Sequence, residues 1–98
     1  MTTRYQTALA FARFASAQCH NARTDDVEYR LHGHCIARWI EPTPGHWIVR
    51  FDWCGWYTPT TAAHMNDILR ALGVNMRVSY AQARDGRADS VFDITVTR

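Results

Sequence analysis

The clearest hydrophobic pattern in the chain lies in residues 53–73, WCGWYTPTTAAHMNDILRALG. Thr58 followed by Pro59 is a typical helix start, because threonine caps the first turn and proline at the first helical position loses no hydrogen bond. Gly73 is a typical helix end. The large apolar residues between these signals are spaced at i, i+3, i+4 and i+7, on one side of a helix: Met65, Ile68, Leu69 and Leu72. The pattern predicts a helix over residues 59–72.

Apolar and polar residues alternate along other segments, as they do in half-buried strands. Residues 46–53 alternate most clearly, and the turn sequence PTPG separates them from residues 34–41, which are rich in strand formers. These two segments predict a hairpin. A short edge strand is predicted at 27–31, and two further strands at 74–80 and 91–96, with a tight turn at Asp85-Gly86 between them.

The N-terminal segment has helical spacing. Residues 5–19 place small and apolar side chains on one side of a helix, and residues 20–26, HNARTDD, form a polar connection after it. On this helix Phe14 lies nearly opposite the apolar side and Phe11 on its flank. Two exposed phenylalanines near each other indicate a contact patch.

These elements predict one domain spanning residues 1–98, of the α+β class. The order is α-β-β(-β)-α-β-β, and the short connections favour a mainly antiparallel sheet of four to five strands with both helices packed on one face. The chain has no apolar run long enough to span a membrane. Its alanine-rich beginning is interrupted by Arg13, unlike a signal peptide. We therefore expect a cytoplasmic protein.

The charged residues are unusual in kind. The chain has eleven arginines and no lysine against nine acids, and its net charge is +2. Arginine codon preference in a GC-rich genome is one explanation. The charge itself is too small for a dedicated nucleic-acid binder. Three widely spaced cysteines, an odd number, argue against a secreted disulfide framework and favour reduced thiols: Cys19, Cys35 and Cys54.

Histidines provide one candidate for chemistry. The triplet His32-Gly33-His34 resembles the zinc motif of 6-pyruvoyl-tetrahydropterin synthase-like enzymes, and that resemblance implies His20 as a third ligand. In the family, a catalytic cysteine lies between the first histidine and the pair, whereas no cysteine lies between residues 20 and 32 here. A zinc-binding enzyme is therefore kept as an alternative. The main expectation is a non-enzyme without metal or cofactor, since no glycine-rich phosphate loop is present either.

Aromatic and arginine residues indicate binding instead. Trp56 and Tyr57 follow Gly55 at the predicted corner between strand and helix, and tryptophan, tyrosine and arginine dominate the hot spots of protein interfaces. The expected contact residues for a protein partner combine this corner, the open face of the sheet and the N-terminal patch: Trp56, Tyr57, Arg38, Arg50, Arg30 and Phe14. Arginines beside aromatics on a sheet are also compatible with a small nucleic-acid-binding protein, the first alternative.

A longer resemblance covers about 45 residues. It joins Ile36-Ala37-Arg38, the corner sequence GWYTPTT and the helix sequence MNDILR with Asn66. This combination is similar to small uncharacterised phage and mobile-element proteins, a group that includes anti-CRISPR inhibitors. The resemblance implies an inhibitor that blocks a type I surveillance complex or its nuclease by occluding it inside a bacterial host. Aromatic, arginine and scattered acidic residues would make the contact, because the chain lacks the acidic face of DNA-mimicking inhibitors.

Overall fold

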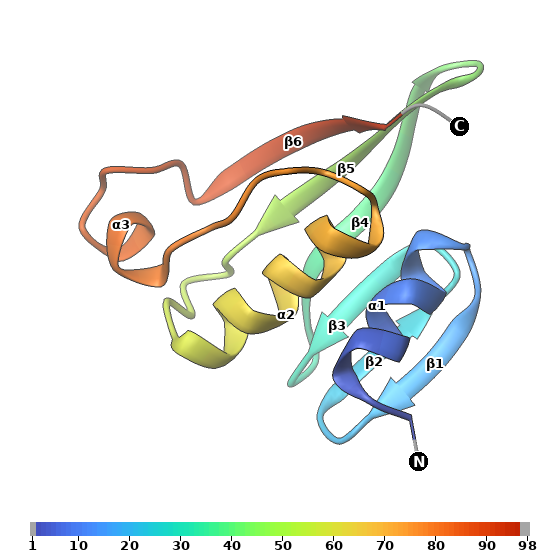
Figure 1. Cartoon of the computed structure of the whole chain (residues 1–98). Coiled ribbons are helices and arrows are strands. Elements are labelled where there is room, and N and C mark those ends of the chain that lie inside the picture. Colours follow the sequence, from blue (N-terminus) through green and yellow to red (C-terminus); the bar gives the residue numbers. More distant parts are fainter. Residues whose placement is uncertain (1, 97–98) are drawn as a thin grey trace.

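The chain forms three helices and six strands in the computed structural model, which describes residues 2–96 (Figure 1). The elements follow one another in the order α1 (Arg4–Ala12), β1 (Ser16–Cys19), β2 (Ala22–Asp25), β3 (Glu28–Leu31), β4 (His34–Thr43), β5 (His46–Asp52), α2 (Pro59–Ala71), α3 (Tyr80–Arg84) and β6 (Val91–Val96). None of the helices within residues 2–96 is long and apolar enough to cross a membrane.

The six strands form one sheet whose spatial order is the sequence order, β1-β2-β3-β4-β5-β6, and every neighbouring pair is antiparallel. Residues 53–90 leave the sheet after β5, build α2 and α3, and return to pair β6 with β5 (Figure 1). The sheet therefore grows by one strand at the edge from which the helical segment departed.

Helices α1 and α2 lie side by side over the same face of the sheet (Figure 1). The core lies between them and this face, and it includes the fully buried Phe11 of α1, Ile68 of α2 and Tyr29, Val49 and Phe51 of the sheet. The predicted α+β class is confirmed. Within residues 2–96 the sheet has six strands rather than the predicted four to five, and there are three helices rather than two.

The helix expected at 59–72 is α2, with the predicted caps. Thr58 accepts a hydrogen bond from the Thr61 amide at 3.2 Å, and Pro59 is in the first turn. Gly73, with φ of +77°, ends the helix in the left-handed region that glycine tolerates. Three residues of the predicted stripe are fully buried against the sheet: Met65, Ile68 and Leu69.

The helix predicted over residues 5–19 is too long. α1 ends at Ala12, Arg13 caps it, and Phe14 turns the chain with φ of +55°. The residues expected as its last turn form β1, and the expected polar connection forms β2. Buried and exposed residues alternate along β2, and the buried ones are Ala22 and Thr24. Alanine is too small and threonine too polar to give a hydrophobic signal in the sequence. Because β2 pairs with it, β3 is an interior strand and not the edge strand predicted.

The strand predicted at 74–80 is also wrong. The side chain of Asn66 in α2 makes two hydrogen bonds with the backbone of Val78. The Val78 amide donates to Asn66 Oδ1 at 2.7 Å, and Asn66 Nδ2 donates to the Val78 carbonyl at 3.2 Å. The segment is therefore held against α2 and leads into α3. The Asp85-Gly86 turn ends α3 instead of joining two strands.

Candidate functional site

The face of the sheet that the helices leave uncovered carries four arginines in two cross-strand pairs. Arg23 of β2 lies opposite Arg30 of β3, and Arg38 of β4 lies opposite Arg50 of β5. Their strand neighbours on the helix side, such as Thr24, are buried. The arginines therefore point away from the core, and we call these four residues the arginine face.

Acidic residues at both ends extend the second pair into a row across four strands. Glu28 lies opposite Arg38, and Asp93 lies opposite Arg50, so the row reads Glu28, Arg38, Arg50, Asp93. Arg50 binds Asp93 through two hydrogen bonds of 2.8 and 3.0 Å. This contact lowers the pKa of Asp93 and raises that of Arg50. Among residues 2–96, no carboxylate forms an ion pair with Arg38.

Arg30 has internal partners on the same face. Its guanidinium binds Glu28 at 3.0 Å and the Gly33 carbonyl at 3.2 Å, which ties it to the β3–β4 turn. A hydrogen bond with the Cys35 thiol and the charge of Arg30 lower the pKa of Glu28. About two-fifths of the Arg30 side chain still faces solvent.

The corner after β5 brings Trp56 to the surface. Cys54 and Gly55 both have positive φ, +55° and +77°, and the Trp56 amide donates to the Trp53 carbonyl at 2.9 Å, as in a type I′ turn. The Asp52 carboxylate supports the turn by accepting from the Cys54 amide at 2.8 Å. This tight reversal leaves Trp53 in the core and Trp56 54 % exposed.

The neighbouring aromatic residues are less accessible. Tyr57 packs on Trp53 with ring centroids 5.8 Å apart, and it is half-buried. Phe14 is half-buried against Trp39 and Trp47, with centroid distances of 4.6 and 5.2 Å. Phe11 is fully buried, so the expected patch of two exposed phenylalanines does not form. Trp56 is the exposed aromatic among the expected contact residues.

A groove lies beside Trp56 at one end of the sheet. It consists of two adjoining cavities of about 470 and 520 Å³, which share Leu31, His32 and Thr60 in their lining. His34 lines the first cavity, and its ring lies 5.4 Å from that of Trp56. The second cavity extends to the starts of α1 and α2 and is lined by His20 and His64. We call the two cavities together the histidine groove.

His64 at this groove is held by a buried hydrogen bond. Its Nδ1 lies 2.6 Å from the hydroxyl oxygen of Tyr29. Burial, helped by the nearby charge of Arg4, lowers the pKa of His64 to about 4, so the imidazole is neutral at pH 7. Burial raises the pKa of Tyr29 far above its usual range, so the phenol keeps its proton. Phenol is the donor and Nδ1 the acceptor in this pair, which leaves the ring proton of His64 on Nε2.

The residues of the zinc alternative all line the histidine groove but come from different turns and strands. His20 lies in the β1–β2 turn and His32 in the β3–β4 turn, while His34 begins β4. Within residues 2–96, no three histidine, cysteine or acidic side chains are placed to hold one metal ion. Burial raises the pKa of the Cys35 thiol to about 11 and also raises that of Cys54, so neither thiol is activated as a nucleophile.

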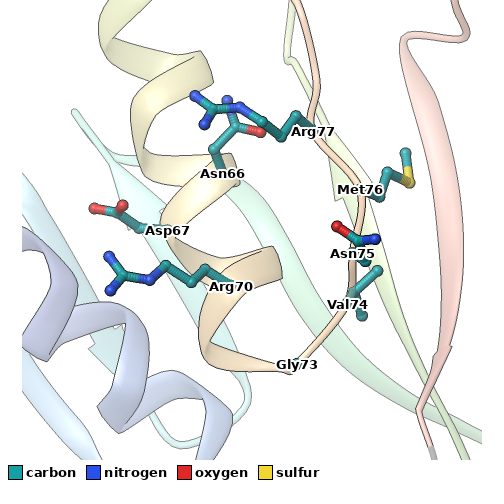
Figure 2. A pocket seen from close by; sticks show the side chains of 8 residues that line it. All are labelled: Asn66, Asp67, Arg70, Gly73, Val74, Asn75, Met76 and Arg77. Carbon is teal, nitrogen blue, oxygen red and sulfur yellow. The ribbon is translucent and has the colours of Figure 1, made fainter.

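A third cavity lies between α2 and residues 73–77 (Figure 2). The side chains that line it point in different directions: Asp67 and Arg70 point toward α1, whereas Asn75 and Met76 lie on the opposite side of the cavity (Figure 2). Asp67 is paired with Arg4, and Arg70 lies over the Tyr5 ring at 4.5 Å. Asn66 is occupied with Val78. These groups hold elements together, so we do not regard this cavity as a functional site.

The structure brings Arg30, Arg38 and Arg50 onto one surface, as expected, and adds Arg23, which lies in the segment predicted as a polar connection. The Tyr29–His64 pair was not anticipated. Its members are 35 residues apart in the sequence, and neither lies in a motif. Comparison of the chain with protein-family models, curated proteins and solved structures gives no match.

Proposed function

We propose that this chain is a non-catalytic binding protein that inhibits its partner by covering a surface, in the manner of anti-CRISPR proteins. The observation that supports this most strongly is the arginine face. Like charges placed directly opposite each other on neighbouring strands destabilise a sheet. In each pair one arginine is already bound to an acid, Arg30 to Glu28 and Arg50 to Asp93. A partner that supplies anionic groups to Arg23 and Arg38 would relieve the remaining repulsion, which favours a role outside the isolated chain.

The distribution of acids favours a protein partner over nucleic acid. The arginine pair at the centre of the row is flanked by Glu28 and Asp93, each on a neighbouring strand. A phosphate backbone would meet these two carboxylates as well as the arginines, and repulsion would offset part of the attraction. A protein surface that carries both signs of charge fits the row better. The resemblance of the corner and helix sequences to phage proteins makes a type I CRISPR surveillance complex, or its nuclease, the first partner to test.

The first test is co-elution of the protein with a purified type I surveillance complex and, separately, with its nuclease, after nuclease treatment of unbound nucleic acid. We expect a stoichiometric complex for the unmodified protein. Double charge reversal with Arg38→Glu and Arg50→Glu should abolish it. The matched control reverses Arg13 and Arg87, which are exposed on the helix side and after α3, and should retain binding.

Three results would contradict the proposal. The unmodified protein could fail to bind either component, the reversed variant could bind as tightly as the control, or binding could require added nucleic acid and fall steeply with salt. The last result would favour the nucleic-acid alternative, because release of counterions makes phosphate contacts strongly salt-dependent. Circular dichroism of each variant confirms that the sheet is intact.

A further inference from the structure

Strand β6 forms one edge of the sheet, and the outer side of its backbone is unpaired. Among residues 2–96, β6 pairs with β5 alone, and Figure 1 shows it as the outermost strand. The Trp53 amide donates to the Ser90 carbonyl at 3.0 Å, so Ser90 directs its backbone groups toward β5. Because these directions alternate along an antiparallel strand, the N–H and C=O groups of Val91, Asp93 and Thr95 point outward.

This edge lacks the features by which proteins usually prevent an edge strand from pairing with another chain. β6 is six residues long, contains neither proline nor lysine, and keeps one register with β5 along its whole length. Its one charged residue, Asp93, is held by two hydrogen bonds from Arg50. The opposite edge strand, β1, has four residues and lies against α1. β6 is therefore the edge at which we expect pairing.

The apolar side chains of β6 are incompletely covered. Phe92, Ile94 and Val96 lie on the helix side of the sheet and pack on the core, but all three are only partly buried. Phe92 stacks on Phe51 of β5 with ring centroids 5.0 Å apart. A further strand beside β6 would cover the outer sides of these three residues and continue the core.

We propose that β6 pairs with β6 of a second copy of this chain, as an antiparallel dimer in which Ile94 lies opposite Ile94 of the second copy. Residues directly opposite each other share a face of the sheet, and outward-pointing residues must meet to exchange hydrogen bonds. Registers centred on Asp93 and on Ile94 both meet these conditions and pair most of the strand. Centring on Asp93 places two carboxylates opposite each other, which is unfavourable, so charge selects the register centred on Ile94.

The selected register makes β6 complementary to itself. On the uncovered face, Asp93 of each copy lies opposite Thr95 of the other, so that the threonine hydroxyl can donate to the carboxylate. On the helix side, Phe92 of each copy lies opposite Val96 of the other, and aromatic residues beside β-branched ones stabilise sheets. Apolar, acceptor and donor positions thus match when the strand meets its own copy in reverse. This match favours a second copy over an unrelated chain.

The dimer has a consequence for the arginine face. Antiparallel pairing of two identical edges places a two-fold axis perpendicular to the sheet. The two sheets then form one continuous sheet, and both arginine faces lie on the same side of it. Dimerisation does not depend on the proposed inhibition, so either proposal can fail without the other.

The test is sedimentation equilibrium of the full chain over a range of protein concentrations. We expect the mass to rise from that of one chain toward that of two. Thr95→Asp places an acid opposite Asp93 in both pairs and should weaken association about tenfold. Thr95→Lys places a cation there and should tighten association by a similar factor. Lysine on an edge strand opposes unspecific pairing, so tighter association would identify this register.

Amide hydrogen exchange gives a second measurement. The Asp93 and Thr95 amides face solvent in a single chain and bond to the second copy in the dimer. Their protection should therefore rise with protein concentration. Ser16→Asp and Ser16→Lys are the matched controls, because Ser16 is exposed on β1 at the opposite edge. Both should associate as the unmodified chain does, and circular dichroism checks that every variant keeps its sheet.

Four results would overturn the proposal. The mass could stay that of one chain at every concentration, which would leave the edge to a different partner. The two Thr95 variants could leave association unchanged or shift it in the same direction. The Ser16 variants could change association as much as the Thr95 variants do. The Asp93 and Thr95 amides could remain unprotected in the dimer.

Discussion

At the scale of single residues, the feature with the largest electrostatic consequence is the Tyr29–His64 hydrogen bond. Both side chains are buried between the sheet and α2, and their 2.6 Å contact satisfies a phenol and an imidazole nitrogen together. Neutral His64 is compatible with this environment, whereas its protonated form would have to donate from Nδ1 and carry a charge into the core.

This pair predicts a pH dependence of stability. The pKa of His64 is about 4 in the folded chain and near 6.5 when unfolded, so between these values the unfolded state binds the extra proton. Stability therefore falls as pH decreases from about 6.5 to 4, by about 3 kcal/mol in total. Urea unfolding at steps across this range measures the loss.

The double variant Tyr29→Phe/His64→Leu is the control for this prediction, because it lacks the titrating imidazole. Its stability should be nearly independent of pH in the same window. The pKa values of the Glu28 and Asp93 carboxylates are lowered in the folded chain. Their contribution to stability is lost only as pH falls below their usual pKa values, which lie at the lower end of the His64 range or beneath it. Parallel pH curves for the variant and the unmodified chain would contradict the assignment to His64.

At the scale of elements, Asn66 decides the path of the chain after α2. Residues 74–79 have strand-like alternation, but the carboxamide of Asn66 satisfies both backbone groups of Val78. A side chain that makes the hydrogen bonds a neighbouring strand would otherwise make satisfies these backbone groups, so the segment does not have to pair in a sheet. The segment can then continue to Ser79, whose side chain caps α3.

Replacing Asn66 should therefore loosen this segment more than it weakens the sheet. Asn66→Ala leaves the Val78 amide and carbonyl without partners, and we expect a cost of about 1–3 kcal/mol. Amide hydrogen exchange should show the Val78 amide losing protection while that of Val49 in the sheet follows global unfolding only. Asn75→Ala is the matched control, because Asn75 is exposed. Unchanged exchange at Val78 in Asn66→Ala would contradict the role of this contact.

At the scale of the whole molecule, one layer of helices covers one face of the sheet (Figure 1). The other face carries the charged side chains of the arginine face. The covered face supplies the stability, through burial of large side chains such as Trp53 and Phe51. The uncovered face carries the like-charged pairs, which cost stability. This division separates the source of folding free energy from the surface proposed for binding.

Relief of one like-charged pair should stabilise the free protein. Arg23 lies between Gln18 and Arg30, so Arg23→Thr removes repulsion without removing an ion pair. We expect a gain of about 0.2–1 kcal/mol in the free energy of unfolding, larger at low salt. Gln18→Thr, on the neighbouring strand, is the control for strand propensity. Equal effects of the two substitutions, or no dependence on salt, would show that the repulsion is negligible.

Local signals explain which elements the sequence predicts correctly. α2 has a cap, a proline, an apolar stripe and a terminal glycine within residues 58–73, so its boundaries follow from neighbours in the chain. The β4–β5 hairpin and β6 likewise show alternating large side chains. β1 and β2 lack such residues, and their pairing depends on cover from α1, which a local pattern does not contain.

The sequence by itself determines the α+β class, the helix at Pro59–Ala71 and the exposed arginines of the central strands, because each depends on spacing between near neighbours. Tertiary structure alone decides that Arg23 joins those arginines, that Asn66 holds Val78, and that His64 meets Tyr29 at the groove. Some of these contacts join residues that lie far apart in the sequence. Others depend on the pairing of strands whose sequences lack alternating large apolar residues. Their energies come from burial and hydrogen-bond satisfaction, which exist only once the helices have packed on the sheet.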